Sequence, residues 1–136
     1  MSLDLMSLER AVIAAPPGLD AAAALGQPAS TLVRGGAFLF VSGLVAVDPA
    51  TGQRAPGTTM SETRLILANL KRMLEAAGSS MDKVVKVNVL LASMLEAVPM
   101  NDVYATFFPD PPPARTVCGA RLPDGCRVMI ECTALA

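Results

Sequence analysis

The strongest constraint on the fold is a change of hydrophobic period in the middle of the chain. Over residues 61–77, apolar side chains recur every three or four positions, which is the spacing of an amphipathic helix. Gly78 follows as a helix stop. Over residues 84–91 the period becomes two, so every second side chain from Val85 to Leu91 is expected on one face of a strand. A helix therefore leads directly into a strand.

Further strands and a second helix are predicted on both sides of this pair. Ser93 and Glu96 have the spacing of a capping box at a helix start, and Pro99 predicts a kink inside that helix. The predicted elements are a short strand near 11–14, a hairpin of 31–34 and 38–42, a helix over about 93–107, and a final hairpin of 115–122 and 126–134 with its turn at Pro123-Asp124-Gly125.

This order predicts an α+β domain, in which a mixed sheet carries both helices on one face. No element remains to cover the other face, and 52% of the residues are hydrophobic. A second copy of the chain is the economical cover, so we expect a homo-oligomer. A single domain is expected over residues 1–136, with 1–27 as a lead-in. The opening Met-Ser-Leu is compatible with a tag remnant, with Met6 as the natural start.

Composition excludes several classes of function. The chain has 11 basic and 12 acidic residues, a net charge of -1, which argues against a nucleic-acid partner. It has no histidine, which removes Ser-His and Cys-His nucleophile pairs and histidine metal ligands. We expect no metal, no membrane span and a cytoplasmic location. The three cysteines, Cys118, Cys126 and Cys132, are interpreted as small buried hydrophobic residues.

Few side chains remain that could carry chemistry. Arg115 enters a predicted strand, and its planar guanidinium suits a carboxylate. Ser42 and Gly43 end a strand, where a hydroxyl and an approachable backbone could meet a ligand. Glu131 could act as an acid or base. Residue chemistry alone favours ordinary structural roles for all of these.

In combination, the motifs of the chain resemble the YjgF/RidA family over about residues 28–136. Each motif is weak alone, and their order and spacing carry the resemblance. The motifs are Phe40-Val-Ser-Gly43, Asp48-Pro-Ala-Thr-Gly52, Asn69-Leu-Lys, Leu74-Glu-Ala-Ala-Gly-Ser79, Val84-Val-Lys-Val-Asn88-Val, Asn101-Asp-Val-Tyr104, Pro113-Ala-Arg-Thr116 and Ile130-Glu131.

The resemblance implies a chorismate-mutase-like fold and a homotrimer whose sheets form a central barrel, with sites in the clefts between subunits. It implies hydrolysis of 2-imino acids to 2-keto acids and ammonia without a cofactor. Arg115 would bind the substrate carboxylate, and Ser42 and Gly43 would supply a hydroxyl and backbone contacts. Asn101 and Val117 would complete the substrate pocket.

Two positions depart from the pattern of active imine deaminases. Met129 stands where a glutamate positions the water in that family, and Ala29 stands where a tyrosine is usual. A thioether accepts no strong hydrogen bond and takes no proton. Three hypotheses therefore remain open: an imine deaminase or a related hydrolase, a non-catalytic binder of small carboxylates, and a role directed at protein or RNA.

Overall fold

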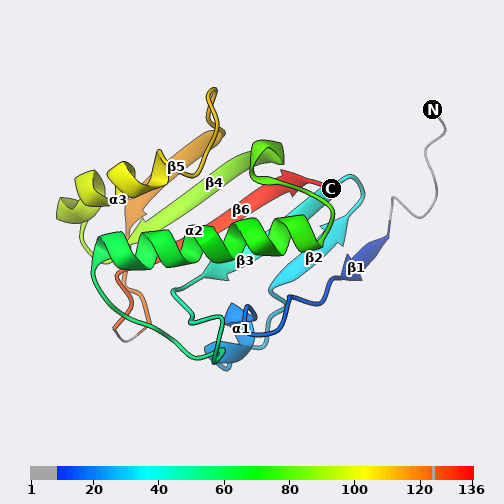
Figure 1. Ribbon diagram of the computed structural model, residues 1–136, viewed down its shortest axis with the longest axis horizontal. Coiled ribbons are helices and arrows are strands. Elements are labelled where there is room, and N and C mark those ends of the chain that lie inside the picture. The colour runs from blue at the N-terminus through cyan, green and yellow to red at the C-terminus, as the bar shows by residue number, and fades with distance from the viewer. Residues whose placement is uncertain (1–8, 124) are drawn as a thin grey trace.

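The computed structural model describes residues 9–123 and 125–136 (Figure 1). Residues 1–8 of the predicted lead-in, and Asp124 of the predicted turn, lie outside the described residues. The described part contains six strands and three α-helices, with the α+β class that the sequence predicts. The strands are β1 (Arg10–Val12), β2 (Leu32–Gly35), β3 (Phe38–Leu44), β4 (Val84–Leu91), β5 (Ala114–Gly119) and β6 (Val128–Leu135), and the helices are α1 (Ala21–Ala24), α2 (Thr59–Ala76) and α3 (Ala97–Tyr104).

The six strands form one mixed sheet in the order β1-β2-β3-β6-β4-β5. β4 and β5 run parallel, and every other neighbouring pair is antiparallel. The expected final hairpin was wrong, because β6 pairs with β3 on one side and β4 on the other. In this central position β6 buries alternate side chains and satisfies both of its backbone edges. β5 is left as the edge strand of the sheet.

Helix α2 matches the predicted helix within two residues at its N-terminus and one at its C-terminus. Thr58 caps it, accepting a hydrogen bond from the Ser61 amide (3.0 Å), while the Ser61 hydroxyl accepts one from the Thr58 amide (2.9 Å). Figure 1 shows α2 lying across one face of the sheet, with α3 near β4 and β5 on the same side. The main core lies between this face and the helices.

The second predicted helix is shorter than expected. A 3-10 turn, η3 (Met94–Glu96), precedes α3, and the Ser93 hydroxyl accepts a hydrogen bond from the Leu95 amide rather than forming a capping box. Pro99 therefore lies in the first turn of α3, where an amide has no partner within the helix. The expected kink inside the helix was wrong for this reason.

Strand β4 has an irregularity that the alternation pattern does not reveal. Its register against β6 shifts between Val84 and Lys86, so Val85 leaves the buried face and is 39% exposed. Val87, Val89 and Leu91 are buried as expected. The shift adds one residue to the strand and inverts the expected direction of Val85.

The far face of the sheet is left uncovered within the described chain. Leu39 and Val41 of β3 point into the core, whereas Phe38 and Phe40 are 40% and 47% exposed. Leu135 of β6 is 42% exposed. This open face carries exposed apolar surface, and the sequence predicts that a second copy of the chain covers it.

Candidate functional site

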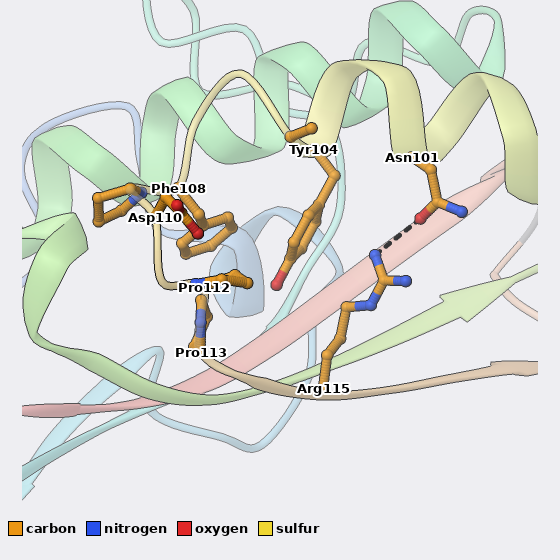
Figure 2. Close-up of a pocket in the computed structure, with 9 residues that line it drawn as sticks. Asn101, Tyr104, Phe108, Asp110, Pro112, Pro113 and Arg115 are labelled. Atoms are coloured by element: carbon orange, nitrogen blue, oxygen red, sulfur yellow. Dashed lines mark hydrogen bonds between the residues drawn. The ribbon is translucent and has the colours of Figure 1, made fainter.

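The guanidinium of Arg115 is held in place by two residues of α3. It donates a hydrogen bond from Nη1 to Oδ1 of Asn101 (2.7 Å), and its central carbon lies 4.7 Å from the centroid of the Tyr104 ring (Figure 2). Asn101 and Tyr104 are three residues apart and so share one face of the helix. Arg115 pairs with Val87 across β4 and β5, on the side of the sheet that faces the helices.

This arrangement leaves Arg115 ready for an anion. Among residues 9–123 and 125–136, no carboxylate forms an ion pair with its exposed side chain. The hydrogen bond to Asn101 uses one N–H, so the remaining donors of the fork stay available. A cation held by an amide and an aromatic ring loses less side-chain freedom when it binds a carboxylate.

Tyr104 is the site residue that sequence reasoning missed. The helix pattern assigns it to an apolar stripe, and the ring does pack on Phe108, with centroids 4.5 Å apart. Its hydroxyl is buried and has no hydrogen-bond partner among the residues that the structure describes. Burial raises the pKa of Tyr104 to about 12, with Arg115 lowering it and Cys132 raising it to smaller extents. The phenol is therefore a neutral donor at ordinary pH.

A cavity of about 490 Å³ opens beside Arg115. Its walls come from the end of α3 and from the proline-rich segment that leads into β5. The lining residues are Asn101, Tyr104, Ala105, Phe108, Pro109, Asp110, Pro112, Pro113 and Arg115. The cavity is mostly apolar, and its polar groups are few, as in many small-molecule sites.

Ser42 and Gly43 lie on the open face instead. The Ser42 hydroxyl donates a hydrogen bond to the Ser30 carbonyl (2.6 Å). A Cβ atom added at Gly43 would lie 2.6 Å from Sδ of Met129, so the methionine packs closely against this glycine. Ala29 and Ser42 line a common surface depression. Ala29, Ser42, Gly43 and Met129 therefore gather at one place.

The predicted site residues thus fall into two groups that one chain does not bring together. Asn101, Arg115 and Val117 form the arginine half, since Val117 follows Arg115 by two residues on β5. Ser42, Gly43, Met129 and Ala29 form the serine half. Strands β6 and β4 separate β3 from β5, which amounts to about 14 Å at about 4.8 Å per strand. The halves also lie on opposite faces of the sheet.

Glu131 lies near the serine half, because it lines a second depression of the open face together with Ser42. Its side chain is exposed on the open face, where it accepts a hydrogen bond from Nδ2 of Asn88 (2.8 Å). The cysteines only partly match the expectation: Cys132 is buried, Cys126 is half-buried, and Cys118 is exposed because β5 is an edge strand. Nη2 of Arg54 donates to Sγ of Cys126 (3.1 Å), a contact absent from the sequence interpretation.

The described residues contain neither a cluster of metal ligands nor a membrane-spanning helix. Within residues 9–123 and 125–136, no group of three or more His, Cys, Asp or Glu side chains is placed to hold a metal ion. In the same part of the chain, no helix has the length and apolar character needed to cross a membrane.

Comparisons with known proteins agree on one family. The endoribonuclease L-PSP family model matches residues 19–136. The 2-iminobutanoate/2-iminopropanoate deaminase of Mus musculus is 41% identical over 116 residues, covering 85% of this chain and 85% of that protein. A RutC family protein of Pyrococcus horikoshii is 42% identical over 110 residues, covering 80% of this chain and 86% of that protein.

Solved structures lead to the same family. A protein of the Rid family from Yersinia pestis superposes with a TM-score of 0.83 at 30% identity, covering 94% of this chain and 100% of that one. RidA from an Antarctic Psychrobacter species superposes with a TM-score of 0.80 at 29% identity, covering 90% and 98%. The chain therefore belongs to the endoribonuclease L-PSP family, which is also called the YjgF/RidA family.

Proposed function

We propose that this protein is a 2-imino acid deaminase-like hydrolase that holds the carboxylate of a small 2-imino or 2-keto acid on Arg115. The observation that carries the proposal is the Arg115 guanidinium, fixed by Asn101 and Tyr104 and without a carboxylate partner in the described chain. The deaminase from Mus musculus, 41% identical, supports the reaction class. No cofactor enters the proposed reaction.

The proposed site is shared between copies of the chain. The arginine half and the serine half lie on opposite faces, so a complete cleft needs Arg115 of one copy and Ser42 with Gly43 of another. The exposed Phe38 and Phe40 on the open face support such an association. We infer a homotrimer, as the family resemblance implies.

In the proposed reaction, Arg115 orients the acid so that its C2 atom faces a water molecule. The water oxygen forms a bond to C2, and the C=N electron pair moves to nitrogen, which is protonated. The C2–N bond then breaks, ammonia leaves, and loss of the hydroxyl proton gives the 2-keto acid. The Ser42 proton already engages the Ser30 carbonyl, so the Ser42 oxygen acts as an acceptor for the iminium N–H or the water.

The decisive experiment generates 2-iminopropanoate with an amino-acid oxidase and follows its disappearance. We expect the wild-type protein to accelerate hydrolysis over buffer, and Arg115→Ala to abolish the acceleration. Arg115→Lys keeps the charge but loses the planar fork, so we expect only partial activity. If 2-iminopropanoate disappears no faster with folded wild-type protein than in buffer alone, the deaminase function is rejected.

A second candidate is a non-catalytic binder of small carboxylates. Met129 favours it, because its thioether lies against Gly43 where the family pattern has a water-positioning glutamate. Calorimetry with pyruvate or 2-oxobutanoate separates the candidates. Binding that requires Arg115, without any turnover of 2-iminopropanoate, would favour the binder.

A role in RNA cleavage is not part of the proposal. The net charge of -1 argues against a nucleic-acid partner, and the absence of histidine removes the most common general base. We expect purified protein to leave a messenger RNA intact under conditions in which it binds pyruvate.

A further inference from the structure

The cavity beside Arg115 is much larger than a three-carbon acid requires. Its volume of about 490 Å³ lies in the range of about 300–1,000 Å³ that holds larger small molecules. Arg115 and Asn101 line it together with apolar residues, so a carboxylate on the guanidinium would have its remaining atoms next to this space. The cavity is continuous with the proposed carboxylate site.

The walls of the cavity are apolar and stiff. Tyr104 and Phe108 supply two packed aromatic rings, and Pro112 with Pro113 face them from the segment before β5. Figure 2 shows the Tyr104 ring between Arg115 on one side and Phe108 with Asp110 on the other. Such walls favour branched aliphatic or aromatic groups over polar ones.

The hydroxyl of Tyr104 is an independent sign that a ligand with a hydrogen-bond acceptor enters this space, and the proposed acids supply one in their carboxylate or 2-oxo oxygens. Tyr104 is only 5% exposed, and within residues 9–123 and 125–136 its hydroxyl has no hydrogen-bond partner. Buried hydroxyls usually have a partner, and leaving one without costs free energy. Figure 2 shows this hydroxyl pointing into the space bounded by Pro112, Pro113 and Arg115.

We propose that this cavity receives the side chain of the ligand, and that the protein selects monocarboxylic 2-imino and 2-keto acids with a branched aliphatic or aromatic side chain. The inference rests on the proposed role of Arg115 and names the substrate class of that site. Asp110 sets the limit to one carboxylate, because its charge lies beyond Tyr104 from Arg115 and repels a second anionic group.

The test is calorimetry of the wild-type protein with pyruvate, 4-methyl-2-oxopentanoate and 2-oxoglutarate. Each buried methylene strengthens binding by about fourfold, so we expect 4-methyl-2-oxopentanoate to bind at least about tenfold more tightly than pyruvate. 2-Oxoglutarate has the same main-chain length and a second carboxylate, and we expect it to bind no more tightly than pyruvate.

A variant that fills the cavity tests whether the cavity causes the preference for the larger acid. Ala105 lines the cavity at the end of α3 and is exposed, so Ala105→Phe adds a ring at this wall. We expect this variant to lose the preference for 4-methyl-2-oxopentanoate over pyruvate. Val98→Phe is the matched control, since Val98 is 69% exposed on the same helix and does not line the cavity.

The possible outcomes separate this inference from the proposed function. Equal affinity for pyruvate and 4-methyl-2-oxopentanoate would overturn the inference while leaving carboxylate binding by Arg115 in place. A preference that survives in Ala105→Phe would also overturn it. Failure of all three acids to bind would reject both the inference and the proposed function.

Discussion

Burial raises the pKa of two weakly acidic side chains, Cys132 and Tyr104. The Cys132 thiol moves from 9.0 to about 12, mainly through burial and then through the charge of Glu131. The Tyr104 hydroxyl moves from 10.0 to about 12. Above pH about 9 the unfolded chain loses the Cys132 proton while the folded chain keeps it, and Tyr104 adds the same effect above pH about 10. Stability therefore falls as the pH rises through this window.

We expect the unfolding free energy measured with urea to contain a constant contribution from these two groups up to pH about 9. This contribution should decline toward pH 12. Cys132→Ala removes the first group, so its unfolding free energy should begin to decline about one pH unit later than that of the wild type. The comparison uses the slope against pH, because the substitution also changes packing. Parallel curves for the two proteins would contradict the assignment.

Met129 is the residue whose replacement is expected to raise turnover most. Its side chain lies against Gly43, so a carboxylate introduced there would stand at the serine half of the site. We expect Met129→Glu to speed the loss of 2-iminopropanoate by about 100-fold or more, the usual range for a positioned base. The measurement is the rate after oxidase generation of the imine.

Met129→Gln is the control for this gain, because glutamine has the same shape as glutamate and cannot take a proton. Calorimetry with pyruvate on both variants checks that the carboxylate site is still occupied, since both keep Arg115. If the glutamine variant turned over as fast as the glutamate variant, proton transfer at position 129 would play no part.

The arginine half shows how far residue-level prediction reached. Arg115 and Asn101 were predicted through the family resemblance, and their hydrogen bond at 2.7 Å brings them together. Tyr104 was not predicted, because an aromatic residue at helical spacing indicates a core position. The available signal was the spacing of three residues between Tyr104 and Asn101, which places both on one face of the helix. Only the packing of that face against Arg115 of β5 makes Tyr104 part of the site.

At the level of elements, a buried glutamate ties α2 to two other segments. Glu62 is 1% exposed, and its Oε1 accepts hydrogen bonds from the amides of Arg127 (2.8 Å) and Val128 (3.3 Å). Its Oε2 accepts one from the Gly57 amide (3.0 Å). The carboxylate thus connects the start of β6 and the loop before α2 to the helix.

Glu62→Gln should destabilise the protein by about 1–3 kcal/mol, because the side-chain amide turns a donor toward a backbone donor and leaves it unpaired. Urea unfolding at one protein concentration measures the change. Glu75→Gln is the matched control on the exposed face of the same helix, with an expected effect within about 0.5 kcal/mol. Equal changes in the unfolding free energy at both positions would mean that the buried carboxylate stabilises the protein no more than an exposed one does.

Elements with a regular internal period were predicted well, and so was the local hairpin of β2 and β3, whereas the long-range pairing of β6 was not. Helix α2 was predicted almost to its ends because its periodicity is local. The β5–β6 hairpin was wrong because adjacent strands in sequence usually pair, whereas β6 is inserted between β3 and β4. The shift at Val85 was missed because a bulge leaves the alternating composition unchanged.

At the scale of the whole molecule, the sequence predicts the α+β class and the family. It also predicts an uncovered sheet face, because it provides only two long helical segments and one side of the sheet receives both. The contribution of a second copy to the proposed site depends on side chains that lie on opposite faces of the sheet. Under the proposed function, the separation of Arg115 on β5 from Gly43 on β3 means that a complete site needs a second copy.

A mixing experiment tests this requirement directly. Arg115→Ala disables the arginine half, and Gly43→Leu fills the serine half, where even a Cβ would lie 2.6 Å from the Met129 sulfur. Neither variant alone should bind 4-methyl-2-oxopentanoate or pyruvate. If the variants are unfolded together and refolded as mixed trimers, one interface type joins an intact Arg115 to an intact Gly43. With random assembly about a quarter of the sites should recover wild-type affinity in calorimetry. Mixing folded trimers without exchange is the control, and no recovery after refolding to trimers would show that the site is not shared between copies.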